Sequence, residues 1–85
     1  MTDIIIQGIY GRMGRTLVEK IAGRQDCRVV AGVDCQAGQA GDIPVYTTFS
    51  DLPCRGVIID FSSPAGAVAA AEYSAANGMP CVIMW

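Results

Sequence analysis

Three evenly spaced glycines, set between an apolar run and an amphipathic segment, constrain the fold of this chain most strongly. Residues 4–17 read IIIQGIYGRMGRTL, with glycines at positions 8, 11 and 14. The β-branched run over residues 4–6 predicts a buried strand. From Met13, apolar residues recur at helical spacing until Gly23, which predicts a helix over residues 13–22. The glycines therefore occupy a turn that leads from a strand into a helix.

Strands and helices alternate along the rest of the chain. The second helix is rich in alanine and covers residues 64–77, with Ser62 or Ser63 as its cap and Pro64 as its first residue. This alternation predicts an α/β fold, a Rossmann-like open parallel sheet with flanking helices, truncated after about the fifth strand. The expected strands are residues 4–6, 29–33, 45–47, 56–60 and 80–84, with a turn at Ser50 or Asp51.

The first turn has the properties that a bound dinucleotide pyrophosphate requires. At Gly8 the chain must leave the strand sharply, at Gly11 a side chain would collide with the phosphates, and Gly14 lets the helix pack closely on the strand. The N–H groups of Arg12 and Met13 would face the anion, aided by the helix dipole. The spacing GxxGxxG is a weak signal alone, because glycines also occur in such turns for structural reasons.

An acid ends the second predicted strand and strengthens this interpretation. Asp34 lies 20 residues after Gly14, where a carboxylate can accept hydrogen bonds from ribose hydroxyls. It repels a 2′-phosphate and favours NAD(H), and Cys35 stands where an arginine would pair with that phosphate. Arg12 is an alternative partner for the phosphate or an ordinary solvated loop arginine. Proteins that bind S-adenosylmethionine also end this strand with an acid, so the adenosine contact alone leaves the nucleotide open.

Composition narrows the classes of function. Charged residues make up 16% of the chain and the net charge is −2 without a Lys/Arg cluster, which argues against nucleic acid. No apolar run approaches the roughly 18 residues of a membrane span. The N-terminus carries an acid where a signal peptide would be basic, so the cytoplasm is expected. Four scattered cysteines and no histidine argue against a metal site and against histidine-based catalysis within these residues.

Three segments resemble those of a known family. GIYGRMGRTL, residues 8–17, resembles the GxxGRMG loop of the 4-hydroxy-tetrahydrodipicolinate reductase (dihydrodipicolinate reductase) family. VIIDFSSPAG, residues 57–66, is similar to that family's (V/I)IDF(S/T)xP stretch. GMPCVI, residues 78–83, is similar to the strand before its GTTG loop. The segments follow the family's order and leave the region over residues 35–54 as the variable part.

The resemblance implies that residues 1–85 form the N-terminal dinucleotide-binding domain of a reductase. Such an enzyme reduces the cyclic imine precursor of diaminopimelate and lysine with NADH or NADPH as cofactor. The residues expected to contact the cofactor are Gly8, Ile9, Tyr10, Gly11, Arg12 and Met13 at the pyrophosphate, Asp34 at the adenine ribose, and Phe61 and Ser62 beside the cofactor. Ser62 also has a simple interpretation as a helix cap, and Phe61 as a packing residue.

The chain departs from the family at its end, where Met84 and Trp85 stand in place of the first residues of the GTTG loop. The family's catalytic stretch, HHxxKxDxPSGT, has no counterpart, so no catalytic residue is assigned and this chain alone is expected to be inactive. We expect a fragment without the C-terminal domain, which implies that substrate binding and a homotetramer belong to the full-length enzyme. A stand-alone nucleotide-binding or redox-sensing module, or another NAD(P)-dependent dehydrogenase, remains the alternative.

Overall fold

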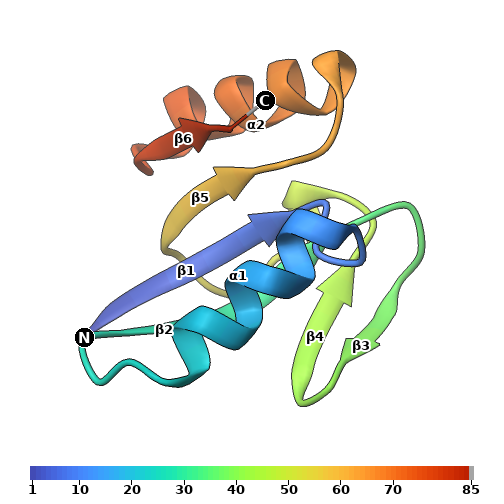
Figure 1. The fold of residues 1–85 in the computed structure, drawn as a ribbon. Coiled ribbons are helices and arrows are strands. Elements are labelled where there is room, and N and C mark those ends of the chain that lie inside the picture. The colour runs from blue at the N-terminus through green and yellow to red at the C-terminus, as the bar shows by residue number, and fades with distance from the viewer. Residues whose placement is uncertain (85) are drawn as a thin grey trace.

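The computed structural model describes residues 1–84 and arranges six strands in one sheet with two helices (Figure 1). A short 3₁₀ helix, Phe49–Asp51, occupies the place of the expected turn. In chain order the elements are β1 (Thr2–Gln7), α1 (Arg12–Ala22), β2 (Cys27–Val33), β3 (Gly38–Ala40), β4 (Ile43–Tyr46), β5 (Val57–Asp60), α2 (Pro64–Asn77) and β6 (Cys81–Ile83).

The sheet has the order β3-β4-β2-β1-β5-β6 and is mostly parallel. β1 lies inside it and pairs in parallel with β2 on one side and with β5 on the other. Because parallel strands point the same way, the carboxyl ends of β1, β2 and β5 meet at one edge, where open α/β sheets bind ligands. The expected Rossmann-like α/β fold is confirmed.

The two helices cover opposite faces of the sheet. Ile4 and Ile6 of β1 pack with Ile21 of α1 on one face, and Ile5 packs with Ala70 of α2 on the other. Neighbouring residues of a strand point to opposite faces, so β1 contributes to both halves of the core. Figure 1 shows α1 crossing the strands near β1 and β2, with α2 next to β5 and β6.

The β3–β4 hairpin differs from the expectation of five parallel strands. β3 is an additional, sixth strand and runs antiparallel to β4 at the edge of the sheet. Gly41 turns the hairpin with a φ of 63°, a left-handed conformation that favours glycine. The strand expected at residues 45–47 begins earlier, at Ile43, because the hairpin adds the pairs Gln39–Pro44 and Ala40–Ile43.

Helix α2 begins and ends where the sequence predicts. Ser63 is its cap, since the Ser63 Oγ accepts the N–H of Gly66 at 3.2 Å, and Pro64 is its first residue. Gly78 ends the helix with a left-handed φ of 65°. Of the two serines expected to cap this helix, Ser62 therefore has a different role. No helix within residues 1–84 is both long and apolar enough to cross a membrane.

Candidate functional site

The loop between β1 and α1 turns sharply at Gly8, as the sequence predicts. Its φ of 84° is a conformation that residues with a side chain rarely adopt. The Gly8 N–H donates to the carbonyl of Val33 at 2.8 Å, which joins the loop to β2. A Cβ at Gly8 would lie 3.1 Å from the carbonyl carbon of Phe61, so the β5–α2 loop passes directly beside this turn.

Gly14 makes the closest packing contact of the loop. A Cβ at this position would lie 2.8 Å from the Cα and 2.9 Å from the oxygen of Ile9, and closer still to the oxygen of Gly8. The sequence predicts that Gly14 packs the helix on the strand, whereas its nearest neighbours belong to the turn that follows β1. Gly14 therefore sets the first turn of α1 directly on the glycine loop.

The N-terminus of α1 has free hydrogen-bond donors. Gly11 occupies the cap position without a side-chain hydrogen bond, and the first turn contains no acid. Within residues 1–84, Arg12, Met13 and Gly14 have N–H groups without a main-chain acceptor, and the Arg15 N–H donates to the Gly11 carbonyl at 3.0 Å. Free donors and an uncompensated helix dipole together suit an anion.

Asp34 joins the end of β2 to the glycine loop. Its Oδ2 accepts the N–H of Tyr10 at 2.8 Å, and its Oδ1 accepts the N–H of Cys35 at 2.7 Å. The sequence predicts where the acid stands but not this connection, which joins residues 24 positions apart. Each carboxylate oxygen still has a lone pair for a further donor, so a ligand hydroxyl can bind as well.

A pocket of about 220 Å³ lies between the glycine loop and the β5–α2 loop. It brings together Gly8, Asp34 and Ser62, three of the residues that the sequence predicts for the site. Gln7 and Gly66 also line it, from the end of β1 and the first turn of α2. Gly66 carries no recognisable signal in the sequence, and Gln7 carries only that of a polar residue at the end of an apolar strand.

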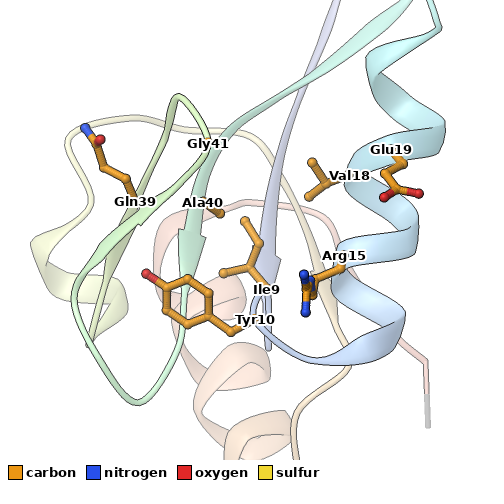
Figure 2. Close-up of a pocket in the computed structure, with 8 residues that line it drawn as sticks. All are labelled: Ile9, Tyr10, Arg15, Val18, Glu19, Gln39, Ala40 and Gly41. Carbon is orange, nitrogen blue, oxygen red and sulfur yellow. The ribbon is translucent and has the colours of Figure 1, made fainter.

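A second hollow, of about 530 Å³, lies on the other side of the loop, between α1 and the β3–β4 hairpin (Figure 2). Tyr10 lines it from the loop, and Arg15 and Glu19 line it from α1. The ring of Tyr10 reaches the hairpin, because a Cβ at Gly38 would lie 3.0 Å from the Tyr10 hydroxyl oxygen. Tyr10 therefore reaches from the glycine loop to the β3–β4 hairpin.

The remaining residues that the sequence predicts for the site differ in their exposure to solvent. Ile9 is fully buried and its side chain packs against Gly32. Met13 is 58% exposed and Arg12 is also exposed. Phe61 is half-buried against the core on the α1 side, and its N–H donates to the carbonyl of Gln7 at 3.0 Å.

A buried carboxylate lies next to the smaller pocket. Asp60 is fully buried, and its Oδ1 accepts the Ser62 N–H at 3.0 Å and also the Ser62 hydroxyl. The Gln7 amide donates one N–H to the same oxygen at 2.9 Å and the other to the carbonyl of Gly66 at 2.9 Å. The Asp60 Oδ2 has no partner within residues 1–84. An acid and an amide that end two neighbouring apolar strands were the available signal in the sequence.

Comparisons with known proteins agree on one family. The model described as "Dihydrodipicolinate reductase, N-terminus" matches residues 2–84. The chain is 37% identical over 81 residues to the 4-hydroxy-tetrahydrodipicolinate reductase of Caulobacter vibrioides, covering 95% of this chain and 31% of that protein. For the enzymes of the same name from Methanospirillum hungatei and Clostridium novyi, identity is 37% over 73 residues and 26% over 84 residues. These matches cover 79% and 98% of this chain, and 29% and 33% of the relatives. The chain thus spans about a third of the length of these curated relatives.

Proposed function

The chain belongs to the dihydrodipicolinate reductase family, and on that basis we propose that it is the part of such a reductase that binds NADH or NADPH. In the whole enzyme, the cofactor would deliver a hydride to a cyclic imine and form tetrahydrodipicolinate, on the way to diaminopimelate and lysine. We place the catalytic and substrate-binding residues outside this sequence. A homotetramer and a cytoplasmic location are proposed for the full-length enzyme.

The observation that carries this proposal is the free N-terminus of α1 beside a cap position that has no side chain. The backbone of Gly11, with φ −72° and ψ 170°, is one that any residue can adopt. A Cβ there would lie 3.3 Å from the oxygen of Gly8, a tight contact, and within 4 Å it would meet no other described residue beyond its neighbours along the chain. The chain itself would therefore need only a small adjustment to accept a side chain at this position, whereas a pyrophosphate resting on the amides of Arg12 and Met13 would leave no room for one.

Asp34 is proposed to bind the adenine ribose. Its half-buried carboxylate lies at the carboxyl end of β2 and lines the smaller pocket with Ser62. A negative charge there would disfavour a 2′-phosphate, so we propose NADH as the preferred cofactor. Phe61 and Ser62, on the β5–α2 loop, would contact the cofactor on the other side of the glycine loop.

The alternatives have less support. The family match over residues 2–84 disfavours an unrelated dehydrogenase. A redox-sensing module would need a reactive thiolate. Burial raises the pKa of the Cys54 and Cys81 thiols, with the nearby Asp3 and Asp60 carboxylates acting in the same direction, which disfavours these two cysteines for that role. All four cysteines are free thiols.

Titration calorimetry on the wild-type chain and on Gly11→Val tests the proposal. We expect the wild type to bind NADH more tightly than NADPH, and Gly11→Val to bind neither while it keeps the far-UV circular dichroism of the wild type. Gly23→Val is the matched control, because a Cβ at Gly23 has no neighbour closer than 3.8 Å and the residue lies at the far end of α1. Unchanged NADH affinity in Gly11→Val would contradict the assigned phosphate site.

A further inference from the structure

Asp60 lies beside the smaller pocket and has no part in the function proposed above. It is fully buried, and the ion pairs found within residues 1–84 do not include it. Removing a carboxylate from water is costly unless hydrogen bonds replace its hydration. The groups that donate to Asp60 therefore indicate what its burial achieves.

The groups that donate to Asp60 belong to two residues that line the smaller pocket. Asp60 Oδ1 accepts the N–H and the hydroxyl of Ser62 and one amide N–H of Gln7. The second amide N–H of Gln7 is held by the carbonyl of Gly66 in the first turn of α2. The amide of Gln7 thus links Asp60 to the first turn of α2.

The direction of these hydrogen bonds decides what the pocket offers a ligand. A main-chain N–H can only donate, so Asp60 Oδ1 is an acceptor, and the Ser62 hydroxyl gives its single proton to the same oxygen. Ser62 then has only lone pairs left for a ligand. Gln7 has used both amide protons and can offer only its carbonyl oxygen.

The packing of α2 keeps this arrangement in place. A Cβ at Gly66 would lie 2.9 Å from the Cβ of Ser62 and would collide with its hydroxyl. The absence of a side chain at Gly66 therefore lets α2 close over Ser62 and Gln7. Asp34, on the same pocket wall, is a carboxylate and adds further acceptor atoms.

We propose that Asp60 is a positioning residue which, through Ser62, makes this pocket a hydrogen-bond acceptor site for a donor group of the dinucleotide. A ribose hydroxyl or the carboxamide N–H₂ of the nicotinamide has this chemistry, whereas a phosphate oxygen does not. The inference rests on the proposed binding of a dinucleotide and adds to it the polarity of one subsite and the residue that sets it.

The test is a double-mutant cycle of Asp60→Ala and Ser62→Ala, with the dissociation constant of NADH measured by titration calorimetry on the 85-residue chain. Each single variant should bind NADH about 3- to 10-fold more weakly, the effect of one hydrogen bond. The double variant should bind no more weakly than Ser62→Ala, since Asp60 acts through Ser62. Asp42→Asn, at an exposed acid in the β3–β4 turn, is the control and should bind like the wild type.

Two further ligands identify the donor. ADP-ribose lacks the nicotinamide, and the 3-acetylpyridine analogue of NADH replaces the carboxamide N–H₂ with a methyl group. If Ser62→Ala weakens ADP-ribose as much as NADH, the donor is a ribose hydroxyl. If Ser62→Ala weakens NADH but neither of the other two, the donor is the carboxamide. Equal affinities of wild type and Ser62→Ala for all three ligands, or additive losses in the cycle, would overturn the proposal.

A ligand-independent measurement separates this inference from the proposed function. If the wild type bound no dinucleotide, the function proposed above would fail, and the Asp60–Ser62 arrangement would be judged by amide hydrogen exchange. Asp60→Ala should speed exchange at the Ser62 N–H while leaving the N–H of Gly66, which bonds to Ser63, unchanged. Unchanged protection of the Ser62 N–H in that variant would remove the basis of the inference.

Discussion

Replacing Asp34 by alanine should weaken the binding of both NADH and NADPH. If Asp34 acted only by repelling a 2′-phosphate, Asp34→Ala would bind NADPH more tightly than the wild type does. In the structure, however, its carboxylate also accepts the N–H groups of Tyr10 at 2.8 Å and Cys35 at 2.7 Å. The loss of the first bond frees the glycine loop, on which the pyrophosphate of either coenzyme is proposed to rest.

The size of the effect follows from these bonds. A hydrogen bond to a charged group contributes about 1.5–3 kcal/mol, and since Asp34 is only half-buried, water replaces part of what is lost. We therefore take the lower end, about 1.5 kcal/mol for the contact with Tyr10, which corresponds to about a 10-fold loss of affinity. For NADPH the net loss should be smaller than this, because removing the charge also relieves its repulsion of the 2′-phosphate. NADH also loses its ribose contact, so its total loss should be about 100-fold.

Calorimetric titration of NADH and NADPH into wild type, Asp34→Ala and Asp34→Asn measures this prediction. Asparagine keeps one acceptor oxygen, so Asp34→Asn should fall between the other two proteins. Asp42→Ala, on an exposed acid outside the loop, controls for the change in net charge. A gain of NADPH affinity in Asp34→Ala would refute the prediction that the loss of this loop contact outweighs the relief of the 2′-phosphate repulsion.

Three other predictions concern the fold itself. Gly14→Ala should lower the free energy of unfolding by about 2–3 kcal/mol in a urea titration, because the added Cβ meets the main chain of the glycine loop. Gly23→Ala is the control, and its free energy of unfolding should stay within about 0.5 kcal/mol of the wild-type value. Equal stabilities of the two variants would contradict this packing. A hydrogen bond and ion pair with Arg24 lowers the pKa of Asp26 to about 2. The contribution of this pair to stability should therefore be complete above pH 3.8, the ordinary pKa of an aspartate, and should be lost as the pH falls towards 2. A titration of the Asp26 carboxyl group by NMR with a midpoint near 3.8 would exclude the pair. Val82→Lys, on the exposed edge strand β6, should reduce the self-association of the chain measured by sedimentation velocity. Unchanged sedimentation would show that the chain does not associate through this edge.

The strands and helices that the sequence predicts well are those with a strong local signal. Each of these signals depends only on residues close together in the chain. They are the isoleucines of β1, the amphipathic spacing of α1, and the residues that begin and end α2, which are Ser63, Pro64 and Gly78. β3 has no such signal, because GQA is short and polar and forms a strand only by pairing with β4. β3 runs antiparallel to β4 because the tight turn at Gly41 reverses the chain. The sequence alone does not distinguish this turn from other turns that the glycine-rich region could form.

The candidate site is predictable in part for a similar reason. Gly8, Gly11 and Asp34 occupy fixed positions relative to strand ends, so their spacing in the sequence translates into a place in space. The contact of Asp34 with Tyr10, and that of Asp60 with Gln7, join residues far apart in the chain. Such contacts depend on strand order and register, which local patterns do not specify.

A pyrophosphate is proposed to rest on the free amides at the N-terminus of α1. Two-dimensional ¹H–¹⁵N spectra of the chain, recorded during a titration with NADH, test this most directly. The N–H signals of Arg12, Met13 and Gly14 should move with increasing ligand and saturate together, while that of Gly23 at the other end of α1 stays fixed. If the three amides keep their positions at saturating NADH, the pyrophosphate does not bind there and the account is wrong.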